Sequence, residues 1–219
     1  MLLQEVKLIT GNLQECRLFY AGQLGLEIVD TTPSGISFRV GTCLMHFSEV
    51  TGSRPLYHLA FSIPNDLFAE ALTWLDTRTT ILPYTPESVI ADFTNWNAKA
   101  FYFRDAGGNI LECITHFDHH TYRHGPFSAE HFLSLMEVGL PVDDVTVTCA
   151  NLHDQYQIPY YRKGPRLRDF SVMGDEEGML IVTKKGRGWL PTQETAEPFP
   201  VSLALKHDHK IINLDFASV

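Results

Sequence analysis

One acidic residue of this chain stands where a buried apolar side chain is expected. Glu112 lies in the middle of ILECI, residues 110–114, a short run that otherwise has the composition of a buried strand. A buried carboxylate without a partner is costly, and it usually takes up a proton or binds a cation. Carboxylate and imidazole groups together suit Zn²⁺, Mn²⁺, Fe²⁺, Ni²⁺ or Co²⁺. Glu112 is therefore a candidate for metal binding or acid–base chemistry.

Three more polar residues, Glu5, His58 and Glu137, stand near the start of apolar strands at a constant spacing. Each lies seven residues before a residue suited to cap the N-terminus of a helix. The three expected caps are Asn12, Asn65 and Asp144. Short apolar runs, separated by turns that contain Gly, Pro or Ser, follow each helix. This rhythm predicts three βαβββ units.

The expected elements follow this plan along the chain. In the first unit they are strands over 5–10, 26–30, 36–40 and 43–47 with a helix from 12. In the second they are strands over 57–63, 88–92, 100–104 and 109–115 with a helix from 65. In the third they are strands over 135–140, 159–162, 170–173 and 179–183 with a helix over 145–156. That last helix begins with four β-branched residues, which are poor helix formers, so only the repeat supports it.

The composition excludes several classes of protein. The 219 residues are 44% hydrophobic, enough for a real core, and the formal net charge of −9 argues against a nucleic-acid partner. No apolar run approaches the ~20 residues of a membrane span, and the N-terminus lacks the basic start of a signal peptide. The four cysteines form no CxxC pair and are expected to be reduced. We therefore expect a cytoplasmic protein without a membrane or nucleic-acid partner.

Three segments resemble the vicinal oxygen chelate superfamily, which includes glyoxalase I, fosfomycin- and bleomycin-resistance proteins and extradiol dioxygenases. They are NLQECRLFYAGQLGLEIVD (12–30), YHLAFSI (57–63) and, most specifically, FYFRDAGGNILECI (101–114). The resemblance covers about residues 3–115. It implies an α+β fold in which tandem βαβββ modules form a curved mixed sheet around a metal cleft, followed here by a third, partial module.

The resemblance also implies a set of metal ligands. The opening strands of the two units offer Glu5 and His58, the last strand of the second offers Glu112, and the last strand of the first offers His46. The ion would be Zn, Ni, Mn, Co or Fe, and two glutamates would neutralise its charge. Taken alone, a histidine in a strand is more often a core residue, and a glutamate can simply face water. In relatives, the position of His46 is a ligand, a plain cleft residue or apolar.

Four residues near the expected cleft are candidates for substrate contacts: Lys7, Tyr102, Arg104 and Trp96. Lys7 shares a face with Glu5, and Tyr102 shares one with Arg104, because strand residues two apart point the same way. Trp96 lies in the loop before that strand. The alternative for each is a surface charge or a core or rim aromatic.

The resemblance implies an enzyme with glyoxalase-like isomerase or lyase chemistry on a small oxygenated substrate. A metal would act as a Lewis acid, and Glu112 or Glu5 would serve as the catalytic base. Two alternatives stay open. One is an extradiol dioxygenase with Fe(II), which the glutamate at position 5 makes less favoured. The other is a non-catalytic, bleomycin-resistance-type protein that binds a small molecule without a metal.

The expected domains are a vicinal oxygen chelate domain over 1–116, a His-rich linker over 117–131, and a degenerate third βαβββ unit with one or more C-terminal strands over 132–219. The third unit has Glu137 at its opening position, but Val182 stands where Glu112 stands in the second unit. Glu137 is therefore expected to be vestigial or structural. Such a half-module could cover the cleft or pair with its copy in a homodimer.

Overall fold

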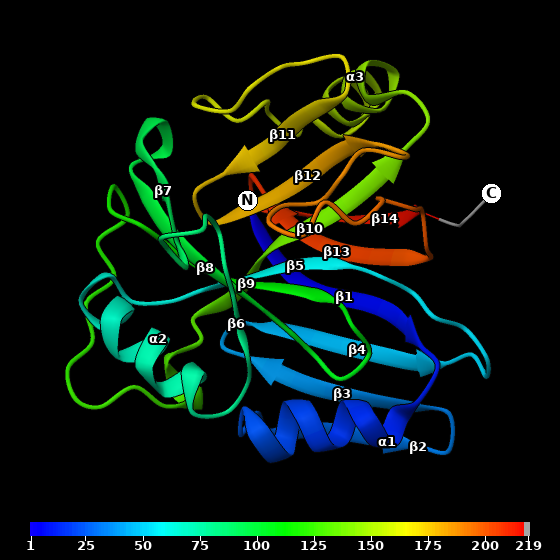
Figure 1. Ribbon diagram of the computed structural model, residues 1–219. Coiled ribbons are helices and arrows are strands. Elements are labelled where there is room, and N and C mark those ends of the chain that lie inside the picture. The colour runs from blue at the N-terminus through cyan, green and yellow to red at the C-terminus, as the bar shows by residue number, and fades with distance from the viewer. Residues whose placement is uncertain (217–219) are drawn as a thin grey trace.

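Two mixed β-sheets dominate the molecule, and helices cover their outer parts (Figure 1). The structure is a computed structural model that describes residues 1–216. Each of the three units contains an opening strand, a helix and further strands, in the expected order. The prediction of an α+β fold built from βαβββ modules is therefore confirmed.

The first unit is complete. Its strands are β1 (Leu2–Thr10), β2 (Ile28–Thr32), β3 (Gly35–Val40) and β4 (Cys43–Glu49), and its helix is α1 (Leu13–Cys16), which continues as a π-helical segment (Arg17–Gln23). Asn12 caps this helix as expected, since its side-chain oxygen accepts hydrogen bonds from the backbone N–H groups of Gln14 and Glu15.

The second unit carries extra short elements. Its strands are β5 (His58–Ser62), β6 (Ile81–Leu82), β7 (Ile90–Phe93), β8 (Ala98–Arg104) and β9 (Ile110–His116), and its helix is α2 (Phe68–Asp76). Asn65 does not cap this helix. Its amide group donates to the Thr115 hydroxyl and the His116 carbonyl instead, and its side-chain oxygen accepts from the N–H of Thr121. Asn65 thus holds the linker after β9.

The third unit has one strand fewer than expected. It contains β10 (Ser134–Val142), α3 (Val145–Tyr156), β11 (Phe170–Asp175) and β12 (Gly178–Lys184), and the chain ends in the hairpin β13 (Val201–His207) and β14 (Lys210–Phe216). The strand expected over 159–162 is only an isolated bridge between Tyr160 and Met173. The β-branched start of α3 is helical, with the side chain of Asp144 capping it through the N–H of Val147.

The units do not pair in the order of the sequence. The first sheet has the order β14-β13-β1-β4-β3-β2, and the second has the order β11-β12-β10-β5-β9-β8-β6, with β7 also on β8. The second unit therefore shares its sheet with the third, through antiparallel β5 and β10, while the first unit pairs with the C-terminal hairpin. Each sheet combines strands from both sides of the boundary expected at residue 116.

The two sheets share one core. Val6 and Leu8 of the first sheet belong to the same hydrophobic cluster as Phe61 and Leu135 of the second. The opposite face of the second sheet carries a smaller cluster that is rich in alanine, including Ala60 and Ala100. These short side chains leave room above that face, and this is where the candidate site lies.

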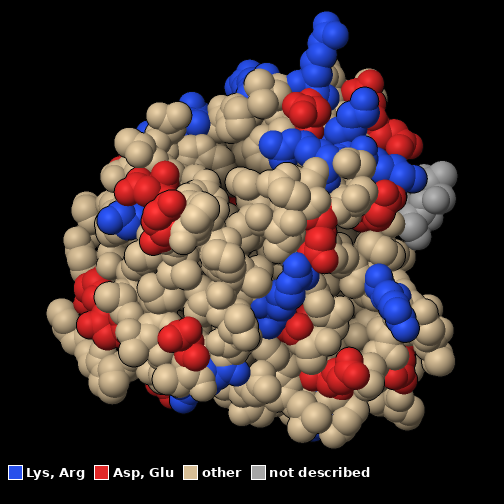
Figure 2. All heavy atoms as spheres, viewed as in Figure 1, with Lys and Arg blue, Asp and Glu red and all other residues tan. Residues whose placement is uncertain are grey.

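The surface mixes acidic and basic side chains. On the face in Figure 2, Lys and Arg gather at the upper part of the molecule, over α3 and the end of β12. All four cysteines are buried and free. Within residues 1–216, no helix has the length and apolar character that crossing a membrane requires.

Candidate metal centre

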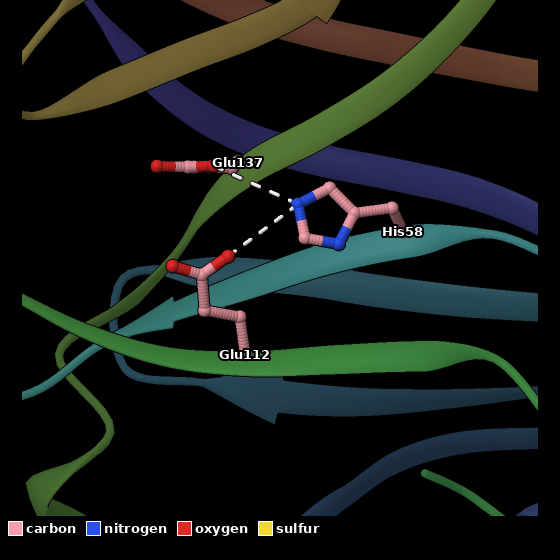
Figure 3. A group of neighbouring side chains, drawn as sticks. All are labelled: His58, Glu112 and Glu137. Atoms are coloured by element: carbon pink, nitrogen blue, oxygen red, sulfur yellow. Dashed lines mark ion pairs between the residues drawn. The ribbon is translucent and has the colours of Figure 1, made fainter. Parts of the chain in front are cut away.

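Three side chains from adjacent strands of the second sheet meet at one point. His58 comes from β5, Glu112 from β9 and Glu137 from β10 (Figure 3). The His58 Nε2 atom lies 3.5 Å from Glu112 Oε2 and 3.8 Å from Glu137 Oε2. One ligand atom of each residue lies within 4.8 Å of the others, and all three residues are buried. We call these three residues the HEE cluster.

The register of the central strand explains this meeting. Ala60 pairs with Glu112 across β5 and β9, and with Glu137 across β5 and β10. Both carboxylates therefore lie level with a small side chain, and His58 stands two residues earlier on the same face. A β-bulge between Leu135 and Glu137 adds one residue to β10, which lets Glu137 face the cleft while Leu135 stays in the shared core.

The electrostatics of the cluster fit a divalent cation. Three buried atoms have no hydrogen-bond partner: His58 Nδ1, Glu112 Oε1 and Glu137 Oε1. Burial raises the pKa of Glu112 well above its usual range, the charge of Glu137 raises it further, and Tyr102 lowers it. Two carboxylates would neutralise a divalent ion, and the imidazole adds a nitrogen donor that suits Zn²⁺, Mn²⁺, Fe²⁺, Ni²⁺ or Co²⁺.

Two of the four expected ligands lie elsewhere, on the first sheet. Glu5 forms a 3.1 Å ion pair with Lys7, and both side chains are partly exposed. His46 lies between two hydroxyls, with Nδ1 2.9 Å from Ser37 Oγ and Nε2 3.1 Å from Ser48 Oγ. The structure thus brings His58 and Glu112 together but places Glu5, Lys7 and His46 on the other sheet.

Glu137, expected to be vestigial, completes the cluster. It occupies the same position in its unit as Glu5, since each follows a bulge in an opening strand, after Leu135 and Leu3 respectively. The seven-residue spacing to Asp144 was the available signal for Glu137. The register places Ile181 across from Gly139, which makes Ile181, rather than Val182, the counterpart of Glu112. The third unit therefore supplies one member of the cluster.

A cavity of about 470 Å³ opens beside the HEE cluster. Its lining residues include all three cluster members together with Phe93, Trp96, Tyr102, Leu167, Phe170, Ile181, Arg187, Trp189 and Leu190. Trp96 and Tyr102, two of the expected substrate contacts, therefore lie at the cavity. Tyr102 stands directly across the β8–β9 ladder from Glu112.

Arg104, another expected contact, is not among the residues that line the cavity, and it pairs with a segment that covers the site. We call residues 185–198, between β12 and β13, the strap. The Arg104 guanidinium donates to the carbonyl of Gly108 and pairs with Glu194 of the strap. Within the strap, the backbone N–H of Trp189 donates to the carbonyl of Glu194. Arg104 thus joins the edge of β8 to the strap.

Trp189 is the strap residue that closes the cluster on one side. Its ring lies 5.1 Å from the ring of His58 and is buried. It also covers Gly139, where a Cβ atom would come within 2.7 Å of Trp189 Cη2. On the far side a second cavity of about 290 Å³ is also lined by His58 and Trp189. Trp189 therefore forms a wall between the two cavities. The strand and helix periodicity of the sequence does not predict this position.

The described fold is similar to two solved structures that cover most of the chain. The crystal structure of a protein described as a "putative dioxygenase" from Bacillus subtilis subsp. subtilis str. 168 is 18% identical, with a TM-score of 0.61, over 95% of this chain and 71% of that one. Glyoxalase I from Zea mays is 14% identical, with a TM-score of 0.55, over 84% of this chain and 66% of that one. No protein-family model and no curated protein sequence matches the chain. At these identities the likeness concerns the fold, and it confirms the fold that the sequence resemblance implies.

Proposed function

We propose that the chain is a divalent-metal-dependent enzyme of the glyoxalase type, with isomerase or lyase chemistry on a small oxygenated substrate, and that the HEE cluster holds the metal. The observation that carries this proposal is that three buried residues each offer one ligand atom within 4.8 Å of the others, and each also has a buried polar atom without a hydrogen-bond partner. Buried polar groups without partners are rare in folded proteins, and each one needs a reason. A cation bound by the cluster would supply that reason.

A three-residue donor set also leaves room for a substrate. Catalytic metal sites commonly combine three protein ligands with at least one open position. When bound, the ion would supply Lewis-acid stabilisation of negative charge on a substrate oxygen. His58, Glu112 and Glu137 line the large cavity directly, so a substrate in that cavity reaches the cluster.

The protein groups around the cluster support proton transfer. Glu112 points Oε2 toward His58 and leaves Oε1 without a partner, so Oε1 is the atom that would accept a proton from a substrate. In the metal-free protein, burial and the charge of Glu137 raise the pKa of Glu112, and a bound cation would offset this shift. Tyr102 and Trp189 are both buried at the cavity and would exclude water from this atom. Glu5, on the other sheet, has no such role in this proposal.

Iron-dependent ring cleavage is the second candidate, and the similarity to the Bacillus subtilis structure favours it. The donor set weighs against it. Iron(II) oxygenases commonly use two histidines and one carboxylate, whereas the HEE cluster has one histidine and two carboxylates. We therefore place glyoxalase-type chemistry first.

The test is the metal content of the purified protein, measured by elemental analysis after loading and desalting. We expect about one ion per chain in the wild type, and a loss of most of it in His58→Ala and Glu112→Gln. Glu15→Gln, which changes an exposed carboxylate on α1, is the matched control and should keep the ion. Stoichiometric metal in both cluster variants would contradict the proposal.

The identity of the bound ion then separates the candidate functions. Zinc, nickel or manganese without oxygen uptake supports isomerase or lyase chemistry. Iron together with oxygen uptake on catechols supports the dioxygenase. A wild-type protein that takes up no metal but binds an aromatic drug tightly supports the third interpretation, a binding protein of the bleomycin-resistance type.

A further inference from the structure

The large cavity has a positively charged wall residue that the proposed function does not use. Arg187 belongs to the strap and lines this cavity with the HEE cluster. Among the described residues that line the cavity, it is the single lysine or arginine. An arginine keeps its charge at any physiological pH and offers a planar set of N–H donors, so it suits recognition of an anion.

The guanidinium group of Arg187 lies at the cavity wall, where it contacts the Phe170 ring and Asp169. Its central carbon lies 4.6 Å from the centre of the Phe170 ring, which also lines the cavity. Its Nε atom forms an ion pair with Asp169 Oδ2 at 3.6 Å, a distance too long for a hydrogen bond, and its side chain is 34% exposed. Arg187 is thus positioned by the Phe170 ring and by Asp169, and within residues 1–216 its guanidinium donates no hydrogen bond.

The rest of the cavity selects a flat apolar body. Its walls include Phe93, Trp96, Tyr102, Phe170 and Trp189. Such aromatic walls favour planar ligands, which stack on them or meet their edges. Outside the HEE cluster, one acidic residue, Asp92, lines the cavity, and its carboxylate accepts a hydrogen bond from the hydroxyl of Thr94, two residues away. Once a divalent ion balances Glu112 and Glu137, Arg187 is the positive charge and Asp92 the negative charge that remain among the described lining residues.

We infer that the substrate is an aromatic anion, with its reacting end directed to the HEE cluster and a carboxylate or similar anionic group held by Arg187. This inference rests on the proposed metal site. It makes Arg187 a specificity-determining residue, contributed by a segment outside all three βαβββ units.

A matched pair of probes tests this assignment. The probes are 3,4-dihydroxybenzoate and its neutral amide, 3,4-dihydroxybenzamide, which differ mainly in the charge of one group. Their dissociation constants are measured by calorimetry, without oxygen, on zinc-loaded wild type, Arg187→Gln and Arg187→Lys, with zinc content determined in each sample. Arg39→Gln is the control, because Arg39 is an exposed arginine of the first sheet that pairs with Glu27.

We expect the wild type and Arg39→Gln to bind the acid about tenfold more tightly than the amide. Arg187→Gln should remove this preference while changing the affinity for the amide less than about twofold. Arg187→Lys should keep part of it, because lysine provides charge without the planar donor set.

Three outcomes would overturn the inference. The first is equal affinity of the wild type for both probes, the second is a preference that persists in Arg187→Gln, and the third is no binding of either probe to zinc-containing protein. Each leaves the proposed metal site standing if zinc is bound in a one-to-one ratio. Absence of zinc from the wild type would instead remove the proposed function, and this inference with it.

Discussion

The two sheets place a glutamate at the same structural position, but their surroundings differ. Glu5 and Glu137 each follow a bulge in an opening strand that pairs with an antiparallel neighbour. Beside Glu137, β5 contributes His58 and β9 contributes Glu112. Glu137 pairs with Ala60, and His58 lies two residues before Ala60 on β5. Glu5 pairs with Ala204 in the same way, but the residue two positions before Ala204 on β13 is Ser202. A glutamate at this position therefore becomes a candidate ligand only when a complete unit pairs with its strand.

The covering of the two positions differs as well. Gly139, two residues after Glu137, lies under Trp189 of the strap, whereas Lys7, two residues after Glu5, is half exposed and pairs with Glu5 itself. The hollow beside Glu5 has a volume of about 210 Å³ and is lined by polar residues of β13 and β14, including Ser202, Asn213 and Asp215. A carboxylate in such a place is satisfied by water and by a lysine, so it has no need of a metal.

The largest expected effect is on metal affinity, and it compares the two glutamates directly. Glu137→Gln removes one negative charge from the HEE cluster, so we expect metal affinity to fall by at least about 100-fold. Glu5→Gln should leave the affinity within about twofold of the wild type, because Glu5 lies on the other sheet. Competition with a chromophoric chelator measures both. Equal losses in the two variants would break the comparison.

This comparison also explains what the sequence could and could not predict. The spacing between an opening strand, a helix cap and the following strands depends on residues that are close together in the sequence. The sequence could therefore predict three units, their opening residues and the unusual Glu112. The choice of Glu5 or Glu137 as the partner of His58 is not local. Both glutamates have the same spacing to a cap and the same kind of strand, and which opening strands pair depends on contacts between units.

The strap could not be predicted for a different reason. It has no strand or helix period, and its role depends on single contacts between distant residues. Arg104 pairs with Glu194, 90 positions away, and Trp189 lies on Gly139. The two-residue alternation placed Arg104 on the same face as Tyr102, but only the folded chain shows that Arg104 reaches the strap.

The second expected effect concerns the covering of the site. In Gly139→Ala the new methyl group would come within 2.7 Å of Trp189, so the ring must move. We expect this overpacking to lower the free energy of unfolding by about 1–3 kcal/mol, measured by urea denaturation. It should also quench or shift Trp189 fluorescence.

Gly22→Ala is the control for that change. Gly22 lies in the helical segment after α1, and a Cβ atom there meets nothing within 4 Å. Alanine should therefore stabilise the protein by about 0.5–1 kcal/mol, because it reduces the freedom of the unfolded chain. A Gly139→Ala variant as stable as Gly22→Ala would show that Trp189 does not pack on β10 as described.

The third effect is the pH dependence of the metal-free protein. Burial, and then the charge of Glu137, raise the pKa of Glu112 in the folded state, so the folded chain holds a proton at pH values where the unfolded chain has released it. Stability therefore falls as the pH rises through the range above the unfolded pKa of about 4.3, by at most about 1.4 kcal/mol per pH unit.

Differences between variants isolate this contribution. Urea denaturation in the presence of a chelator, at pH 5.5 and pH 7.5, should show a smaller loss of stability for Glu112→Gln than for the wild type. Glu137→Gln should lie between them, because it removes the second cause of the raised pKa. Glu5→Gln should follow the wild type. If Glu5→Gln changed the pH dependence as much as Glu112→Gln, the two sheets would not differ as we describe.

The smallest effect compares two arginine–glutamate pairs, one on each sheet. Arg104 and Glu194 are 31% and 42% exposed and tie the strap to β8, whereas Arg39 and Glu27 are 46% and 64% exposed and lie at the first sheet. Exposed ion pairs contribute little, and screening by solvent reduces the gain further. We expect a coupling energy of roughly 0.5 kcal/mol for the strap pair and less for the other, measured by double-mutant cycles with glutamine in place of each residue.

The strap pair should also affect ligand binding, which the pair on the first sheet should not. Because Glu194 helps to hold the segment that carries Trp189, Glu194→Gln should weaken binding to the cavity by about twofold, while Glu27→Gln leaves it unchanged. An unchanged affinity in Glu194→Gln, together with a strap coupling no larger than that of Arg39 and Glu27, would mean that the strap is held by Trp189 and its backbone hydrogen bonds without the help of Arg104.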